Sequence, residues 1–459
     1  MKNILALGLI LFLTFSCAPK PTEEEIAASQ MKQEIVDDLE NNVLAFWAKY
    51  APDSTDGFYG QILADATPVP QANRGAILNA RILWTFSTAY RELKDEQYKV
   101  LADRAANYFL NHFLDKEYGG VFYDLFADGT PAATQKVVYA NAFAIYGLSE
   151  HYRATQNQAS LDAAIDIFKT LATYAYDSIN GGFIEQFSRE WVLPENLYAP
   201  KGMNNNLHVL EALTNLYRVW KDPLLEKIFR TQIDVESNKI LDQTTWHENL
   251  YLTMDWQNLQ HIDSYGHDIE FSWLLVEAAE VLGDEAVLAD TKRIAVNIAE
   301  VQLKEGTDSL GYIKGEKNHN PAPQGFGAFP PPPPRANVKL SKEDQERIAR
   351  MQEMMAANRA ALEQHGERLE WWPQAEAVVG YYNAYQISGD VKFLHASIAA
   401  WNWINKYYID REVGEWYGNV HVDGTPVTTF EKASMWRCPY HNSRMGFEIL
   451  NRIKTIKIK

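Results

Sequence analysis

The sequence predicts an all-α protein, an (α/α)6 barrel in which an inner ring of six helices packs inside an outer ring. Two observations predict it: helical periodicity dominates the chain in twelve segments, and short glycine–aromatic stretches recur between helix pairs. An armadillo-like solenoid is the alternative that the repeat leaves open. The twelve expected helices span about 32–49, 78–93, 97–113, 137–155, 158–175, 206–220, 222–238, 267–282, 284–303, 372–387, 390–407 and 441–454.

The glycine–aromatic stretches predict short β-hairpins between the helix pairs. Glycine permits a tight turn, and the aromatic or apolar residues behind it suit a strand. The first three stretches lie roughly 62 residues apart, and an acidic residue precedes each of the five. The stretches are 57–60, 119–123, 181–184, 311–313 and 414–417, and the acidic residues are Asp56, Asp115, Asp177, Asp308 and Asp410.

The even-numbered helices are the more apolar ones, and we assign them to the inner ring. Runs such as Ile82–Phe86 and Phe271–Leu275 suit helices that are buried on nearly all sides. If the inner helices are parallel, their N-termini surround one mouth of the barrel. Helix N-termini carry partial positive charge, so this mouth would favour an oxyanion.

Composition indicates a globular chain and excludes several classes of protein. Of the 459 residues, 46% are hydrophobic and 22% charged, with a net charge of −17. This acidic balance argues against nucleic acid as a partner, because phosphates demand clustered Lys and Arg. The two cysteines, Cys17 and Cys438, supply no disulfide framework. No glycine-rich phosphate loop or dinucleotide fingerprint occurs, so we expect no nucleotide cofactor. We expect the protein to be a monomer.

The first 17 residues resemble a bacterial lipoprotein signal. Lys2 precedes an apolar run, Ile4–Phe15, and Ser16 precedes Cys17. The run is too short to span a bilayer as a helix. We expect cleavage before Cys17, a lipid on that residue, and a membrane-anchored protein of the cell envelope; a secretory peptide cut nearby without a lipid is the alternative. Residues 18–31 would then form a polar tether.

Residues 32–459 are expected to form one catalytic domain with an insertion at about 314–370. Five prolines, Pro330–Pro334, predict an extended polyproline segment, and Ser341 begins a charged helix that continues to about Gln364. The insertion is interpreted as a surface loop, with a lid over the barrel mouth as the alternative.

Candidate functional residues fall at the starts of the even-numbered helices. A mouth lined by six polar or aromatic side chains predicts a binding pocket. Trp436 adds another flat surface, and sugar rings stack their apolar faces on such rings. Three histidines would suit zinc, but a His-Glu-x-x-His pair and a cysteine cluster are both missing, so we expect no metal. The six residues are Arg81, Tyr139, His208, His267, Trp372 and His441.

Five stretches of sequence resemble the cellobiose 2-epimerase family, within the wider N-acylglucosamine 2-epimerase superfamily. They occur in the order expected for the family and span nearly the whole chain after the signal segment. The resemblance implies an (α/α)6 barrel and an enzyme that epimerises the reducing-end sugar of β-1,4-linked disaccharides such as cellobiose and mannobiose. The stretches are Leu78–Trp84, Asn206–Ala212, Ser264–Glu270, Trp371–Glu376 and Trp436–Arg444.

The resemblance also implies a role for each candidate. His267 and His441 would be the acid/base pair at C2, with Glu270 supporting His267 from one turn along the same helix. The remaining candidate residues would bind substrate. These are Arg81 and His208 at the C1 oxygen, Trp372 and Trp436 against the sugar rings, and Tyr139 and Asn206 at hydroxyl groups.

Three other functions remain open at this point. They are an aldose–ketose isomerase that forms the same enediolate, a glycoside hydrolase or lyase, and a sugar-binding lipoprotein without catalysis. A hydrolase would need two carboxylates flanking the bond, and Asp268 with Glu270 lie too close along one helix to decide this from sequence.

Overall fold

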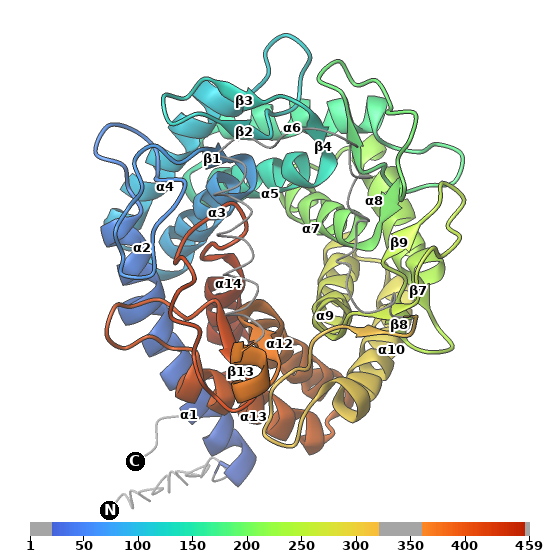
Figure 1. Ribbon diagram of the computed structural model, residues 1–459. Coiled ribbons are helices and arrows are strands. Elements are labelled where there is room, and N and C mark those ends of the chain that lie inside the picture. Colours follow the sequence, from blue (N-terminus) through green and yellow to red (C-terminus); the bar gives the residue numbers. More distant parts are fainter. Residues whose placement is uncertain (1–20, 321–359, 455–459) are drawn as a thin grey trace, which may run out of the picture.

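The computed structural model describes residues 21–320 and 360–454. The expected signal segment with Cys17, the proline run and most of the expected insertion helix lie outside the described residues. Within them, two concentric rings of helices form a closed barrel (Figure 1). The ring closes because α14 packs against both α12 and α3, which excludes the open solenoid.

The helices that we assigned to the inner ring form it. Nearly every residue from Ala76 to Ala89 is buried, including the polar Arg81 and Thr85, as expected for a helix enclosed on all sides. The inner helices are α3 (Ala76–Leu93), α5 (Val138–Thr155), α7 (Met203–Val219), α9 (Tyr265–Leu282), α12 (Trp371–Ser388) and α14 (Tyr440–Arg452).

The outer helices are amphipathic and bury one face against the inner ring. In α8 this face is formed by Leu225, Ile228, Phe229 and Ile233, at helical spacing. Four outer helices end in a π-helical turn. The outer helices and their π-turns are α1 (Glu23–Asp38) with η1 (Leu39–Leu44) and α2 (Ala45–Tyr50), α4 (Glu96–Tyr108) with η2 (Phe109–Phe113), α6 (Gln158–Tyr174), α8 (Pro223–Val235) with η3 (Glu236–Ile240), α10 (Glu285–Val301) with η4 (Gln302–Gly306), and α13 (Val391–Tyr407).

The chain is helical earlier than expected. We predicted a tether over 18–31, but α1 begins at Glu23. Thr22 caps the helix: its hydroxyl accepts from the Glu25 backbone, and the Glu25 side chain accepts from the Thr22 backbone. This capping box and the buried Ala28 and Met31 make the segment part of the outer ring.

None of the helices in the described ranges is both long and apolar enough to cross a membrane.

All five predicted glycine–aromatic hairpins form, and a sixth forms without glycine. The sixth pairs β7 (Leu241–Asp242) with β8 (His247–Glu248), and Trp246 adopts the left-handed conformation there, with φ of 65°. Sequence reasoning missed it because a tryptophan stands where glycine normally takes this conformation. The five predicted hairpins contain the bridges Pro52–Phe58, Leu114–Val121, Tyr176–Phe183, Thr307–Ile313 and Ile409–Trp416.

Further short strands connect neighbouring repeats at the end of the barrel where the inner helices begin. Five of the six pairs contain a strand that leads into an inner helix, and every pairing is antiparallel, so the ends of neighbouring inner helices are tied together. The pairs are β1 (Arg74–Gly75) with β2 (Asp124–Leu125), β2 with β3 (Pro131–Ala133), β4 (Lys136–Val137) with β5 (Gln186–Phe187), β6 (Lys201–Gly202) with β9 (Tyr251–Leu252), β10 (Ile262–Asp263) with β11 (Lys317–Asn318), and β12 (Arg368–Glu370) with β13 (Asn419–His421).

In four of the repeats, a buried ion pair joins the hairpin turn to the segment that leads into the next inner helix. Lys201 shows the pattern: its Nζ donates to Asp177 Oδ2 at 2.8 Å and to two backbone carbonyls. The acidic residues are therefore structural, and in the first repeat Asp53 serves in place of the predicted Asp56. The four pairs are Asp53–Arg74, Asp115–Lys136, Asp177–Lys201 and Asp410–Lys432.

The substitution Lys201→Met should destabilise the fold, because it leaves the Asp177 carboxylate without its buried cation. Removing one partner of a buried pair costs about 3–5 kcal/mol. Urea denaturation followed by circular dichroism would measure it. The matched control is Lys392→Met, which removes an exposed pair with Glu300 and should cost less than about 1 kcal/mol. Equal losses in both variants would contradict a structural role for the buried pairs.

Candidate active site

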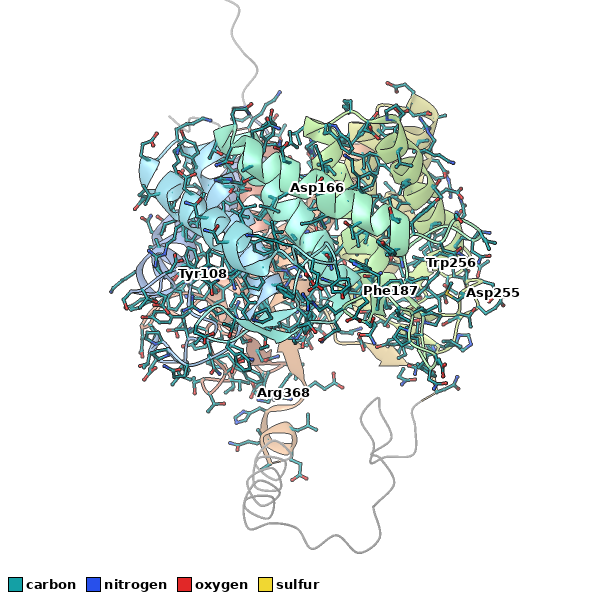
Figure 2. The ribbon with its side chains drawn as sticks, turned by 90° about the horizontal axis from the view of Figure 1, so that it is seen from above. Tyr108, Asp166, Phe187, Asp255, Trp256 and Arg368 are labelled. Carbon is teal, nitrogen blue, oxygen red and sulfur yellow. The ribbon has the colours of Figure 1, made fainter. Side chains whose placement is uncertain are left out.

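A cavity of about 520 Å³ opens at the end of the barrel where the inner helices begin. Figure 2 shows loops and short strands gathered toward this end, where Arg368 is labelled, while Asp166 of α6 lies nearer the other end. All six inner helices contribute to its wall, so their N-termini do surround one mouth. The predicted residues that line it are Arg81, Tyr139, His208, His267, Glu270, Trp372, Trp436 and His441.

The lining residues form two tiers set by helix geometry. The second or third residue of a helix lies at the rim: Tyr139, His267, Trp372 and His441 occupy such positions. The sixth residue lies one turn deeper, because 3.6 residues complete a turn. The sixth residues of α3, α7, α9 and α12 are Arg81, His208, Glu270 and Glu376.

Below the cavity, Arg444 of α14 is buried among three carboxylates from three other inner helices. Its guanidinium donates to Glu211 at 2.5 Å, to Glu376 at 2.7 Å and to Glu270. Burial alone would raise the pKa of Glu211, but the charge of Arg444 and the hydrogen bond to His208 hold it at about 2. Burial and the neighbouring Glu376 carboxylate raise the pKa of Glu270 to about 7.

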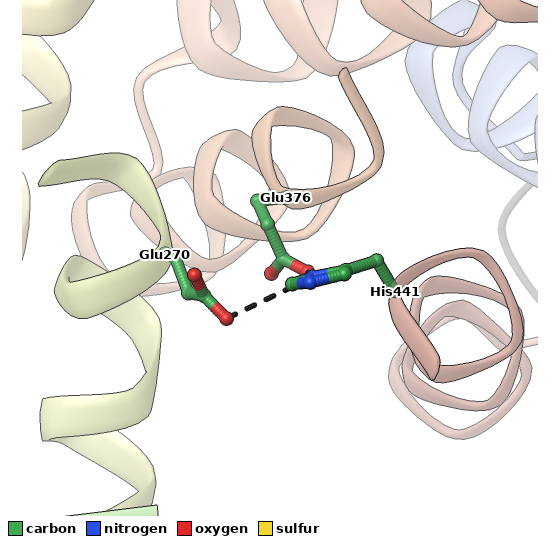
Figure 3. Close-up of side chains that lie close together, drawn as sticks. All are labelled: Glu270, Glu376 and His441. Carbon is green, nitrogen blue, oxygen red and sulfur yellow. Dashed lines mark hydrogen bonds and ion pairs between the residues drawn. The ribbon is translucent and has the colours of Figure 1, made fainter. Parts of the chain in front are cut away.

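His441 is held by this carboxylate cluster (Figure 3). Its Nδ1 lies 2.7 Å from Glu376 Oε1 and 3.9 Å from Glu270 Oε1. An ionised carboxylate only accepts, so Nδ1 carries the proton and Nε2 keeps a free lone pair. Burial, with the charges of Arg81 and Arg444 nearby, lowers the pKa of His441 well below its ordinary value. The ring is therefore a neutral imidazole that can accept a proton at Nε2.

His267 has a different environment from the one we expected. Glu270 does not support it: Glu270 turns toward Arg444 and His441, and the partner of His267 Nδ1 is Ser264 Oγ at 2.7 Å. One turn of helix places Glu270 below His267, but the stronger charge of Arg444 attracts the carboxylate. Burial, together with the nearby His208, lowers the pKa of His267 to about 3, so this ring is also neutral near pH 7.

The two imidazoles lie on one wall of the cavity, with Trp372 in contact with both. The Trp372 ring centroid is 4.6 Å from that of His267 and 5.5 Å from that of His441. Two residues separated by more than 170 positions in sequence thus reach one small volume.

Arg81, on α3 beside α14, brings a positive charge to the cavity. Its Nη2 donates to the Tyr139 hydroxyl at 2.8 Å, its Nη1 to Cys438 Sγ at 3.5 Å, and its guanidinium lies 4.2 Å from the centre of the Phe143 ring. In the described part of the chain no carboxylate pairs with it. A buried cation without an acidic partner is suited to an anion in the cavity. His208 lies beside it, with Nδ1 2.9 Å from Glu211 Oε2.

Trp436 is an exposed aromatic residue of the rim. About half of it, 51%, is open to solvent, and its ring lies 5.7 Å from that of Tyr139. Trp371 also lines the cavity, with the guanidinium of Arg437 4.5 Å from its centre. Flat apolar faces therefore flank a polar floor.

Asn206, expected to bind a hydroxyl group, is a structural residue instead. It is fully buried, and its side chain accepts from the Phe183 backbone at 2.8 Å and donates to the Gly202 carbonyl at 2.9 Å. The fourth residue of four inner helices holds the preceding hairpin in this way: Asn141, Asn206, Asp268 and Gln374 accept from Val121, Phe183, Glu248 and Ile313. The repeat of a polar fourth residue was visible in the sequence and would have revealed this role.

The repeated contact also distinguishes two side chains near Asn206 and Glu270, namely Asn204 and Asp268. Asp268 is bound to His247 and to the Glu248 backbone and does not line the cavity, so it cannot form a hydrolytic pair with Glu270. Asn204, two residues before Asn206, does line the cavity, and its Oδ1 has no hydrogen-bond partner within the described ranges. Glu211, Glu376 and Arg444 were also missed, although the stretches that carry the family resemblance contain them.

Glu270, Glu376 and His441 are the described residues whose ligand atoms lie close enough together to hold a metal, all within 4.8 Å. They do not fit one. Arg444 already donates to both carboxylates, and its positive charge lies where a metal ion would have to be. A second cation would be repelled, and the lone pairs it needs are occupied.

Comparisons with known proteins identify the family of this chain. The model of the N-acylglucosamine 2-epimerase (GlcNAc 2-epimerase) family matches residues 57–323 and 344–442. A cellobiose 2-epimerase of Bacteroides fragilis is 39% identical over 428 residues, which cover 92% of this chain and 98% of that protein. A cellobiose 2-epimerase of Dictyoglomus turgidum is 32% identical over 92% of this chain and 99% of that protein.

Solved structures extend the comparison. Cellobiose 2-epimerase from Bacillus thermoamylovorans superimposes with a TM-score of 0.79 at 33% identity, covering 92% of this chain and all of that one. A D-mannose isomerase shares the fold, with a TM-score of 0.70 at 17% identity, over 94% of this chain and 99% of that one. This chain therefore belongs to the N-acylglucosamine 2-epimerase family, and within it to the cellobiose 2-epimerases. It is an epimerase, an enzyme of the isomerase class.

The substitution Asn206→Ala should reduce the free energy of unfolding by about 1–3 kcal/mol, because it leaves the buried Phe183 amide without an acceptor. Thermal and urea denaturation would measure it. Asn204→Ala is the matched control, two residues away, and should change stability by less than about 0.5 kcal/mol. The assignment of Asn206 as structural would be wrong if its substitution left the fold as stable as the control.

Proposed function

We propose that this protein inverts C2 of the reducing-end sugar of a β-1,4-linked disaccharide, without a cofactor, through ring opening and an enediolate. The observation that carries the proposal is the pair of neutral imidazoles, His267 and His441, on either side of Trp372. Epimerisation at C2 needs one group to remove the proton and another to return one to the opposite face.

The reaction follows from this pair. In the open-chain sugar, the Nε2 lone pair of one imidazole takes the proton from C2, and the C–H electron pair moves into the C1–C2 bond as the C1 carbonyl becomes an enediolate oxygen. The second imidazole, after taking up a proton from solvent at its Nε2, gives that proton to the other face of C2, and the carbonyl re-forms while the first imidazole releases its proton to solvent. Glu376 at His441 Nδ1 stabilises the imidazolium that forms there. Glu270, with its pKa at about 7, can exchange protons beside it.

The enediolate needs compensation for the charge that develops on its C1 oxygen. Arg81 supplies it, because its charge is not neutralised by a carboxylate among the described residues, and His208 lies next to it. The sugar rings would stack on Trp372 and Trp436, with Tyr139 and Asn204 at hydroxyl groups. A cavity of about 520 Å³ accommodates two sugar units.

The similarity to cellobiose 2-epimerases supports cellobiose as a substrate, and mannobiose differs from it only in configuration at C2 of its units. The six inner helices of a single chain build the wall of the cavity. We therefore propose that the enzyme acts as a monomer.

Incubating the protein with cellobiose or mannobiose in heavy water tests the reaction. The expected product is the C2 epimer with deuterium at C2, identified by NMR. His441→Asn should fold normally and lose about 10²–10⁴-fold in turnover, the usual contribution of an acid/base group. Product without deuterium at C2 would refute the mechanism, a ketose product would favour an isomerase, and released monosaccharides would favour a hydrolase.

We also propose that Cys17 carries a lipid and anchors the enzyme in the cell envelope, based on the signal pattern in residues 1–17. Expression in a bacterium fed with a labelled fatty acid should label the wild-type protein and place it in the membrane fraction. Cys17→Ser should lose the label and leave the membrane fraction. Label that persists in Cys17→Ser would contradict the assignment.

A further inference from the structure

A short strand at the base of the insertion is joined to the segment that precedes His267. Strand β11 (Lys317–Asn318) pairs with β10 (Ile262–Asp263), with Asp263 opposite Lys317. The Nε2 of His319 also lies 2.7 Å from Asp263 Oδ2. These contacts hold the residue before β11, Glu316, beside Ser264 at the start of α9. Glu316 lines the cavity at this point.

The hydrogen bonds in this corner determine which nitrogen of His267 carries the proton. The Ser264 hydroxyl donates to Glu316 Oε1 at 3.3 Å and lies 2.7 Å from His267 Nδ1. A hydroxyl has one proton, and an ionised carboxylate can only accept it. Ser264 Oγ must therefore accept from Nδ1–H of His267. The Nε2 of His267 is left with a free lone pair.

We propose that Glu316 is a positioning residue for His267 and acts through the Ser264 hydroxyl. This inference rests on the proposed function. When Nε2 of His267 takes a proton, the ring becomes an imidazolium, and the negative charge of Glu316 stabilises it across one hydroxyl group. Glu376 does the same for His441 by direct contact. The two imidazoles thus have matching supports, one direct and one relayed.

The relay also explains a charge on the rim that the proposed reaction does not otherwise use. Glu316 comes from the described base of the insertion, whereas Ser264 directly precedes α9 and Glu376 lies on α12. An oriented imidazole depends on its outer partner for tautomer and basicity, so losing that partner reduces the rate without removing the reacting group.

A double-mutant cycle with Ser264 tests the relay. Glu316→Ala should lower kcat about tenfold and change KM less than twofold, because outer partners of a functional imidazole contribute about 10–100-fold. Ser264→Ala should have a similar effect. The double variant should be no slower than either single variant, because both remove the same connection. Glu316→Gln, whose amide oxygen still accepts from Ser264, should recover part of the loss.

The matched control is Glu367→Ala, which removes an exposed carboxylate at the other described end of the insertion, outside the cavity wall. It should leave kcat and KM unchanged. A rise in KM with unchanged kcat in Glu316→Ala would overturn the proposal and make Glu316 a direct sugar contact. Fully additive losses in the double variant would overturn it as well.

Nitrogen-15 NMR of labelled histidine provides a readout that does not depend on turnover. The His267 signals, assigned by their loss in His267→Asn, should show the proton on Nδ1 in the wild-type protein and a mixed tautomer in Glu316→Ala. An unchanged tautomer would refute the relay. If the wild-type protein epimerised no disaccharide, the proposed function would fail, and the NMR result would still decide whether Glu316 acts on His267.

Discussion

The charge of Arg444 is the constraint on which the rest of the site depends. Its guanidinium is buried in the middle of the barrel, where an unpaired cation would be very costly. Carboxylates from α7, α9 and α12 surround it: Glu211, Glu270 and Glu376. The cluster therefore joins four of the six inner helices through one side chain. It also leaves more negative than positive charge, and the repulsion between Glu376 and Glu270, with burial, raises the pKa of Glu270.

The three carboxylates around Arg444 differ in their pKa values. Glu211 remains ionised, whereas Glu270 has its pKa at about 7. Glu376 accepts from both Arg444 and Trp273, so its remaining role is to orient the ring of His441. Arg81, on α3 beside α14, has no acidic partner among the described residues. The result is a cavity that holds two neutral imidazoles and an uncompensated cation, the combination that the proposed enediolate would require.

The barrel positions this site through elements that repeat around the ring. The fourth residue of an inner helix holds the hairpin before it, and a buried acid–base pair joins that hairpin to the next inner segment. Gly182 shows how tightly these parts fit: its φ is +72°, and an added Cβ would lie 2.5 Å from the Trp256 ring. Repeated local contacts of this kind hold the six helix ends at the same level. Residues at equal positions along different helices therefore form one tier of the cavity.

Much of this could be predicted from the sequence by itself, because the relevant signals are local. Helical periodicity predicted which segments are helices and which belong to the inner ring, and the glycine stretches predicted five hairpins. The rule that parallel helices share an end predicted which side chains meet. Two features were not predicted, the hairpin at Trp246 and the early start of α1. They depend on single residues, namely a left-handed tryptophan and the cap at Thr22.

Only the tertiary structure decided which partners the functional side chains choose. Glu270 is one helical turn from His267, and local spacing predicted that contact, yet a guanidinium from a distant helix attracts the carboxylate more strongly. Asn206 looked like a sugar ligand, but it accepts from the Phe183 backbone in a hairpin 23 residues earlier in the chain. Glu316 reaches Ser264 only because β10 and β11 pair. Electrostatic and hydrogen-bond partners depend on distances in space, which spacing along the chain does not determine.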